Sequence, residues 1–140
     1  VVIQDTRGRY TSEGDFYPFR DEISDGYDTV EWIARESWSS GKIGMYGASY
    51  VGATQLLAAI SNPPHLTAIA PNVTASNYHE GWTYQGGAFE LDFNLSWALI
   101  HLVSANYENL VNNFGAPPDK IDELNQETET LIDEIEKWQT

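Results

Sequence analysis

The chain has 140 residues, which is enough for one domain with a buried core. It carries 7 basic against 21 acidic residues, a formal net charge of −14. Such a surface repels phosphate backbones, so no nucleic-acid partner is expected. The chain contains no cysteine, which excludes a disulfide framework and a zinc–thiolate site.

Hydrophobic residues make up 41% of the chain and aromatic residues 13%, a composition that argues against disorder. No apolar run reaches membrane-spanning length and no signal peptide is visible, so we expect a cytoplasmic protein without a membrane partner. The chain begins without methionine in the apolar run Val1–Ile3, which is typical of a segment of something larger.

The first half alternates two kinds of pattern. Short apolar runs at residues 1–5, 43–46 and 66–70 predict strands of a parallel sheet. Helical spacing predicts a helix from about residue 24 to 38 and another over residues 51–60. This order predicts an α/β fold, with three neighbouring parallel strands and two crossover helices. The loop between the first strand and helix holds Arg7 and Arg9, which we expect to be solvated; a contact with a substrate anion is the alternative.

The stretch GMYGASYVG, residues 44–52, joins the second predicted strand to the second predicted helix. A serine at such a tight turn predicts a nucleophile elbow, which would lift the hydroxyl of Ser49 clear of the sheet. Valine at position 51 departs from the strict pattern G-x-S-x-G, so an ordinary glycine-rich turn is the alternative. Small residues must flank the turn so that strand and helix approach closely, a demand met by Gly47, Ala48, Gly52 and Ala53. The helix N-terminus after Ser49 supplies N–H groups suited to a developing oxyanion.

The second half differs in character, and we place a boundary near residue 72. A polar, aromatic stretch is followed by a predicted helix over residues 89–114, and Asp119 is expected to cap a last helix. An apolar seam runs along that helix, formed by Ile121, Leu124, Thr128, Leu131, Ile135 and Trp138. Eight acidic residues cover its remaining surface, which we interpret as a solvated face and not as a metal site.

Several motifs in order carry a family resemblance: Gln4–Arg9 (QDTRGR), Ser12–Gly14, Asp25–Ile33, Gly41–Gly52 and Leu66–Pro71. They resemble the CocE/NonD family of serine hydrolases, the cocaine esterase / X-prolyl dipeptidyl peptidase group. That family's elbow reads G-x-S-Y-x-G, which accounts for a glycine at position 52 and not 51. The resemblance is strong over residues 1–71 and looser over 72–100. It implies an α/β-hydrolase core segment with the elbow at 1–71 and a helical cap segment at 72–140.

The resemblance implies a role for four residues. Ser49 would be the nucleophile and the backbone N–H of Tyr50 an oxyanion donor, while Trp82 and Trp97 resemble acyl-pocket positions. Core packing is the alternative for both tryptophans. The implied reaction is a two-step acyl transfer on an ester or amide, either an acyl ester or an X-Pro dipeptidyl substrate, with no cofactor or metal. The partner would be a small molecule or short peptide, and oligomer formation is left open.

The family pattern places the triad aspartate and histidine beyond Thr140 and the second oxyanion donor before Val1. We therefore expect these 140 residues alone to be inactive. The three histidines are expected in other roles: His65 at the surface, His79 in the loop entering the cap, and His101 in cap packing. A non-catalytic interaction module, docking through the acidic amphipathic C-terminal helix, is the alternative from a different class.

Overall fold

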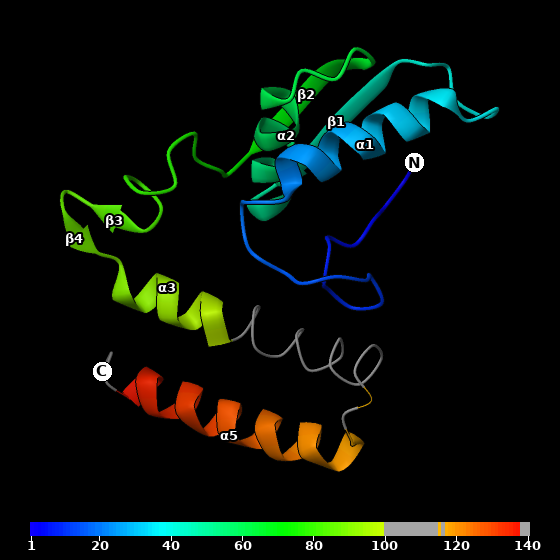
Figure 1. The fold of residues 1–140 in the computed structure, drawn as a ribbon. Coiled ribbons are helices and arrows are strands. Elements are labelled where there is room, and N and C mark those ends of the chain that lie inside the picture. The colour runs from blue at the N-terminus through cyan, green and yellow to red at the C-terminus, as the bar shows by residue number, and fades with distance from the viewer. Residues whose placement is uncertain (100–114, 116, 138–140) are drawn as a thin grey trace. The chain divides into compact units, whose positions relative to one another are not determined.

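The computed structural model describes residues 1–99, 115 and 117–137 (Figure 1). The chain divides into two compact units. One unit comprises residues 17–82, and the other joins residues 1–16 to the part of the chain from residue 83 onward. The predicted boundary near residue 72 stays a prediction, because the units partition the chain by compactness and not by function.

The unit of residues 17–82 is a small α/β layer. It contains α1 (Glu22–Arg35), β1 (Ile43–Ala48), α2 (Tyr50–Ile60) and β2 (Leu66–Asn72), in that order. The two strands pair in parallel, with Met45 opposite Ile69 and Ala48 opposite Asn72 in the register. Helix α2 packs against both strands and α1 packs against α2, as Figure 1 shows. The predicted parallel, helix-alternating arrangement is confirmed for these four elements.

The core of this unit lies where α1 meets α2. Val30 is 2% exposed, while Ala53 and Ala58 are fully buried. Gly26 of α1 lies directly over Ala58, since a Cβ added there would stand 2.6 Å from the Ala58 Cβ. Small residues at this contact therefore let the two helix backbones approach closely.

The strand predicted at residues 1–5 is wrong. This segment pairs with no strand among the described residues, and the exposed fractions of Val1 and Ile3 are 107% and 93%. Apolar residues favour a strand, but a strand forms only where a neighbour accepts its backbone hydrogen bonds. The described sheet therefore has two parallel strands and not the three predicted.

The other unit combines a loop, a hairpin and helices. A two-residue turn at Gly86 and Gly87, both with positive φ, connects β3 (Tyr84–Gln85) to β4 (Ala88–Phe89). Glycines suit this tight antiparallel turn, a hairpin that the sequence pattern did not predict. Helix α3 (Leu91–Trp97) follows; the rest of the helix predicted over 89–114 lies mostly outside the described residues.

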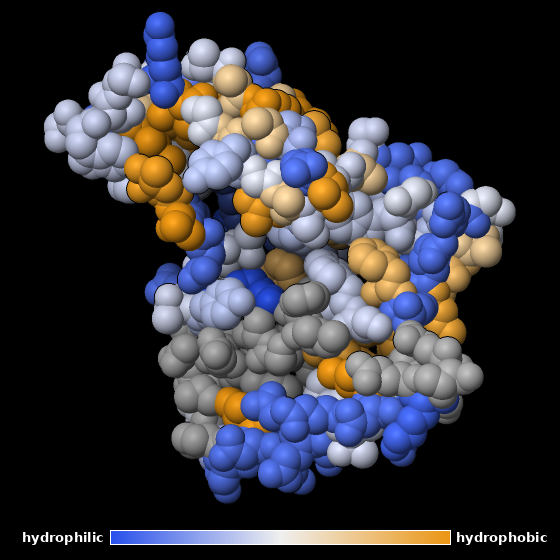
Figure 2. All heavy atoms as spheres, turned by 180° about the vertical axis from the view of Figure 1, so that it is seen from behind, coloured by the Kyte–Doolittle hydropathy of each residue, from blue (hydrophilic) through white to orange (hydrophobic). Residues whose placement is uncertain are grey.

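Helix α5 (Pro118–Lys137) confirms the predicted last helix, although Asp119 lies within its first turn and not at a cap. Thr128 of the predicted seam is 7% exposed, whereas Leu131 is 49% exposed. The outer face forms the hydrophilic band along α5 in Figure 2. Among the described residues, no helix has both the length and the apolar character needed to cross a membrane.

The expectation that Arg9 is solvated is wrong. Its exposed fraction is 9%, and its guanidinium lies 4.8 Å from the centre of the Phe16 ring and 5.7 Å from that of Tyr10. An arginine buries easily against aromatic faces because its planar cation is attracted to their π-electrons. Arg9 therefore packs within its own loop, against the aromatic rings of Tyr10 and Phe16.

Candidate active site

Ser49 is the single residue between the end of β1 and the start of α2. The predicted strand–turn–helix sequence around it is confirmed. Its backbone has φ 57° and ψ −126°, a combination outside the regions that a residue with a side chain normally occupies. Such backbone conformations cost free energy and persist only where the surrounding structure holds them. Three features of this unit hold Ser49.

The first feature is the end of β2. The Ser49 N–H donates to the carbonyl oxygens of Asn72 at 3.0 Å and Val73 at 3.1 Å. The Ser49 carbonyl in turn accepts from the N–H groups of Gly52 and Ala53 at 2.9 and 3.0 Å, which begin the α2 hydrogen-bond ladder. Val73 itself has φ 44°, which is rare for a β-branched residue. Both strands therefore leave the sheet through strained residues at the same end.

The second feature is the pair of glycines that flank the turn. A Cβ at Gly47 would stand 2.6 Å from Val51 Cγ1, and Gly47 has φ 147°. A Cβ at Gly52 would stand 2.9 Å from Thr74 Cβ and 3.0 Å from the Asn72 carbonyl oxygen. Real Cβ atoms do not approach so closely without displacing their neighbours. The structure thus gives a physical reason for both glycines, including the one at position 52.

The third feature is the Gln55 side chain, which reaches back from the second turn of α2. It is the largest fully buried side chain among the described residues. Its amide bonds to the carbonyl oxygens of Gly47 and Val51 and to the N–H of Ala70. Sequence reasoning missed this residue, because a lone glutamine in a helix carries no sign of where its partners will lie.

The Ser49 hydroxyl is exposed, and it makes no capping hydrogen bond to α2 within the described structure. Serine at a helix start normally uses its hydroxyl to cap the helix. Because Ser49 makes no such bond to α2, its oxygen is available to react with a substrate. Tyr50 is the first residue of α2, where backbone N–H groups point out of the helix and the dipole favours negative charge. A carbonyl oxygen gaining charge beside Ser49 would be stabilised there.

The side chain of Tyr50 is tied to the start of α1. Its hydroxyl donates to Oε1 of the buried Glu22 and accepts the Phe19 N–H at 3.2 Å. Glu22 Oε2 is buried and makes no hydrogen bond within the described part of the chain. The 28-residue separation between Tyr50 and Glu22 explains why sequence reasoning missed this contact. These two hydrogen bonds of the Tyr50 hydroxyl, to Glu22 and Phe19, form a clamp. The clamp holds Tyr50, whose backbone N–H is the candidate oxyanion donor.

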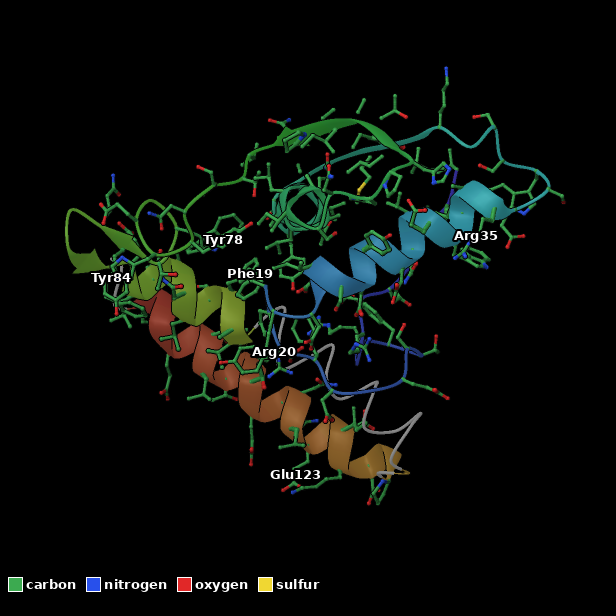
Figure 3. The ribbon with its side chains drawn as sticks, turned by 45° about the horizontal axis from the view of Figure 1, so that its top comes forward. Phe19, Arg20, Arg35, Tyr78, Tyr84 and Glu123 are labelled. Carbon is green, nitrogen blue, oxygen red and sulfur yellow. The ribbon has the colours of Figure 1, made fainter. Side chains whose placement is uncertain are left out.

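An aromatic cluster extends from Tyr50. The Phe19 and Tyr78 side chains lie close together in Figure 3. The Phe19 ring stacks on Tyr78 with centroids 4.5 Å apart, and its centroid lies 4.9 Å from that of Tyr50 and 5.7 Å from that of Trp82. Burial, and then the negative charge of Glu22, raise the pKa of the Tyr78 hydroxyl above its usual value. The structure brings Trp82 into this cluster; Trp97 ends α3 in the other unit.

His65 lies at the opposite end of the sheet. Its carbonyl accepts the Ile43 N–H at 2.9 Å at the start of β1, and its Nδ1 lies 2.8 Å from Glu31 Oε2. Six strand residues at about 3.3 Å each separate that point from Ser49 by roughly 20 Å. His65 is thus a partly exposed structural residue, as predicted, and no base for Ser49.

The other two histidines offer no observed partner for Ser49 among the described residues. The His79 N–H donates to Asn77 Oδ1 in an exposed turn, and His101 lies outside the described residues. In the described part of the chain, no three His, Asp or Glu side chains gather as metal ligands would. The chemistry that the geometry offers is that of an exposed serine hydroxyl beside a helix N-terminus.

Comparison with known proteins identifies the family. The sequence model of the X-Pro dipeptidyl-peptidase (S15) family matches residues 1–138. The chain belongs to this family. Cocaine esterase of Rhodococcus sp. (strain MB1 Bresler) is 44% identical over 101 residues, which is 71% of this chain and 18% of that protein.

Two mycobacterial proteins are similar as well. They are the putative serine esterases Mb1866c of Mycobacterium bovis (strain ATCC BAA-935 / AF2122/97) and MT1883 of Mycobacterium tuberculosis (strain CDC 1551 / Oshkosh). Each is 31% identical over 77 residues, covering 55% of this chain and 12% of the relative. The chain thus matches less than a fifth of the length of these curated relatives. Membership of the X-Pro dipeptidyl-peptidase family confirms the predicted family resemblance.

Proposed function

We propose that the protein is a serine hydrolase that cleaves an ester or amide through an acyl-enzyme on Ser49. The observation that carries this proposal is the Ser49 backbone, held at φ 57° and ψ −126° between β1 and α2 with an exposed hydroxyl. Strain of this kind is rarely kept without a use. The names of the relatives, an esterase and a peptidase family, support the same reaction type.

In the proposed reaction a general base takes the Ser49 proton while Oγ attacks the substrate carbonyl carbon. The carbonyl oxygen becomes an oxyanion, stabilised by the Tyr50 N–H at the start of α2. Collapse of this intermediate expels the alcohol or amine, which takes up the proton from the base. Water then attacks the acyl-enzyme by the same route, releasing the acid and restoring Ser49.

Following the family pattern, we propose that the base and its orienting acid lie beyond Thr140; His65 lies at the wrong end of the sheet. The second oxyanion donor is likewise proposed to lie before Val1. It follows that residues 1–140 alone should hydrolyse esters far more slowly than the complete protein. A missing triad member costs on the order of 10⁴ in rate. Comparable Ser49-dependent turnover by residues 1–140 alone would overturn this assignment.

For substrates we propose acyl esters or X-Pro dipeptidyl amides, with Trp82 and Trp97 contacting the acyl part. The aromatic cluster around Trp82 reaches Tyr50 through Phe19, which supports this role for Trp82. In the complete protein, alanine at either tryptophan should slow hydrolysis of a bulky aromatic ester more than that of an acetyl ester. Equal loss on both esters would assign the tryptophan to packing alone. We also propose that α3 and α5 belong to a helical cap.

A fluorophosphonate probe tests the function. It should modify Ser49 in the complete protein, as mapped by mass spectrometry of the labelled peptide. The Ser49→Ala variant should remain unlabelled, and Ser61→Ala at the end of α2 should label like the wild type. Folded wild-type protein without an adduct on Ser49 would favour the interaction module, with the acidic face of α5 as its docking surface.

A further inference from the structure

Gln55 is a polar side chain in the most deeply buried part of α2. Its exposed fraction is 0%, and its neighbours on the same helix, Ala53, Leu57 and Ala58, are buried apolar residues. An apolar side chain of similar size would fill the same space without needing partners. A buried primary amide is stable only when its donors and acceptor are all used. The partners of Gln55 therefore indicate what the residue is for.

Those partners surround the elbow. Nε2 donates to the carbonyl of Gly47 at 3.2 Å and to that of Val51 at 2.9 Å, while Oε1 accepts the Ala70 N–H at 3.0 Å. Gly47 and Val51 lie two residues before and two residues after Ser49. The side chain thus bonds to both flanks of the turn and to the neighbouring strand.

These contacts close a ring around Ser49. From Gln55 the ring passes to Gly47, along the chain to Ser49, and through the Ser49 N–H to the Asn72 carbonyl at 3.0 Å. From Asn72 it returns along β2 to Ala70 and back to Gln55. A strained turn enclosed in this way cannot relax at one point without breaking one of these hydrogen bonds.

We propose that Gln55 is a positioning residue, which acts through the backbone on both sides of Ser49 to hold its hydroxyl in the orientation for attack. This inference rests on the proposed function and adds a residue outside the elbow motif. Gln55 touches no substrate and takes no proton. Its contribution is to keep the nucleophile in place, and displacement by about 1 Å can cost on the order of 100-fold in rate.

Two variants of the complete protein test the proposal, compared by hydrolysis of an acetyl ester and by the rate of fluorophosphonate labelling. Gln55→Met has a similar volume and removes all three bonds. Gln55→Glu keeps the acceptor for the Ala70 N–H but replaces the donating Nε2 with an oxygen, which the carbonyl oxygens of Gly47 and Val51 would repel. Thr54→Val is the matched control, because Thr54 Oγ1 donates to the same Val51 carbonyl at 3.1 Å yet reaches neither strand.

We expect kcat and the labelling rate constant of both Gln55 variants to fall about 10- to 100-fold per folded molecule, with KM changed less than about threefold. Thr54→Val should stay within about twofold of the wild type. Wild-type rates per folded molecule in either Gln55 variant would overturn the positioning role and leave the proposed function intact. Absence of labelling at Ser49 in the wild type would instead overturn both.

Discussion

The two ends of the β1–β2 pair are held by different kinds of interaction. At the carboxyl end, Ser49 is held at positive φ by the backbone carbonyls of Asn72 and Val73 and by the neutral, buried amide of Gln55. At the amino end, the partly exposed His65 binds the Glu31 carboxylate through both its ring and its backbone N–H.

We therefore expect substitutions at the two ends of this short sheet to have different consequences, for the proposed reaction at one end and for stability at the other. The carboxyl end combines strain, tight packing and an exposed hydroxyl, so small changes there should alter the reaction. The amino end combines charge and solvent, so changes there should alter stability, and only within a range of pH. Reactive groups of parallel sheets gather at the carboxyl ends of the strands, which is where the proposed nucleophile Ser49 lies.

The largest effect is expected from Ser49→Ala. Loss of the nucleophile should lower kcat on the order of 10⁴-fold or more, while the melting temperature changes little because the hydroxyl is exposed and caps nothing. Ser49→Gly should be equally inactive but more stable than Ser49→Ala, since glycine adopts positive φ without strain. Near-normal turnover in either variant would show that Ser49 is not the nucleophile.

The next largest effect is expected from Gly52→Val. The added side chain would collide with Thr74 and with the Asn72 carbonyl, at the point where α2 meets the end of β2. We expect a loss of about 1–3 kcal/mol in unfolding free energy, measured by chemical denaturation, together with loss of activity. Gly44→Ala in β1 is the matched control, because a Cβ there meets nothing closer than 3.9 Å. Equal effects at both positions would contradict the close approach at the elbow.

Tyr50→Phe should have a moderate effect. It removes the hydrogen bond to the buried Glu22 carboxylate and the acceptor of the Phe19 N–H, which should lower the unfolding free energy by about 1–3 kcal/mol. Activity should fall less than in Ser49→Ala, because the Tyr50 backbone N–H remains. Glu22→Gln keeps an acceptor for the tyrosine hydroxyl and should be the milder variant. A fully stable Tyr50→Phe would mean that this clamp contributes nothing.

The smallest effect is expected at the amino end. Burial raises the pKa of the Glu31 carboxyl, but the hydrogen bonds and charge of His65 and the charge of Arg35 lower it below its usual value. The resulting stability is present at neutral pH and is lost as pH falls through the lowered folded-state pKa of Glu31.

Melting curves across pH test this prediction. Glu31→Gln should melt below the wild type at neutral pH, and the difference should shrink in acid, with activity unchanged at neutral pH. Glu129→Gln on α5 changes the same charge at an exposed position and should show no such trend. A difference that grows in acid would contradict the sign of the shift.

Local signals account for what could be predicted. Helical spacing, short apolar runs and the glycines around Ser49 predicted β1, α2 and β2 together with the elbow, since each depends on residues close in sequence. The strand at residues 1–5 failed because a strand needs a neighbour that its own sequence does not specify. The Gln55–Ala70 and Tyr50–Glu22 contacts were missed because they join residues 15 and 28 positions apart.

The central claim is that Ser49 carries the acyl group during turnover. Its most direct test is mass spectrometry of the intact, complete protein, quenched while it hydrolyses a slowly deacylating ester. We predict a mass increase equal to the acyl group, located by digestion on the peptide that contains Ser49 and absent from Ser49→Ala. Sustained turnover with no adduct, or with the acyl group on another residue, would contradict the claim.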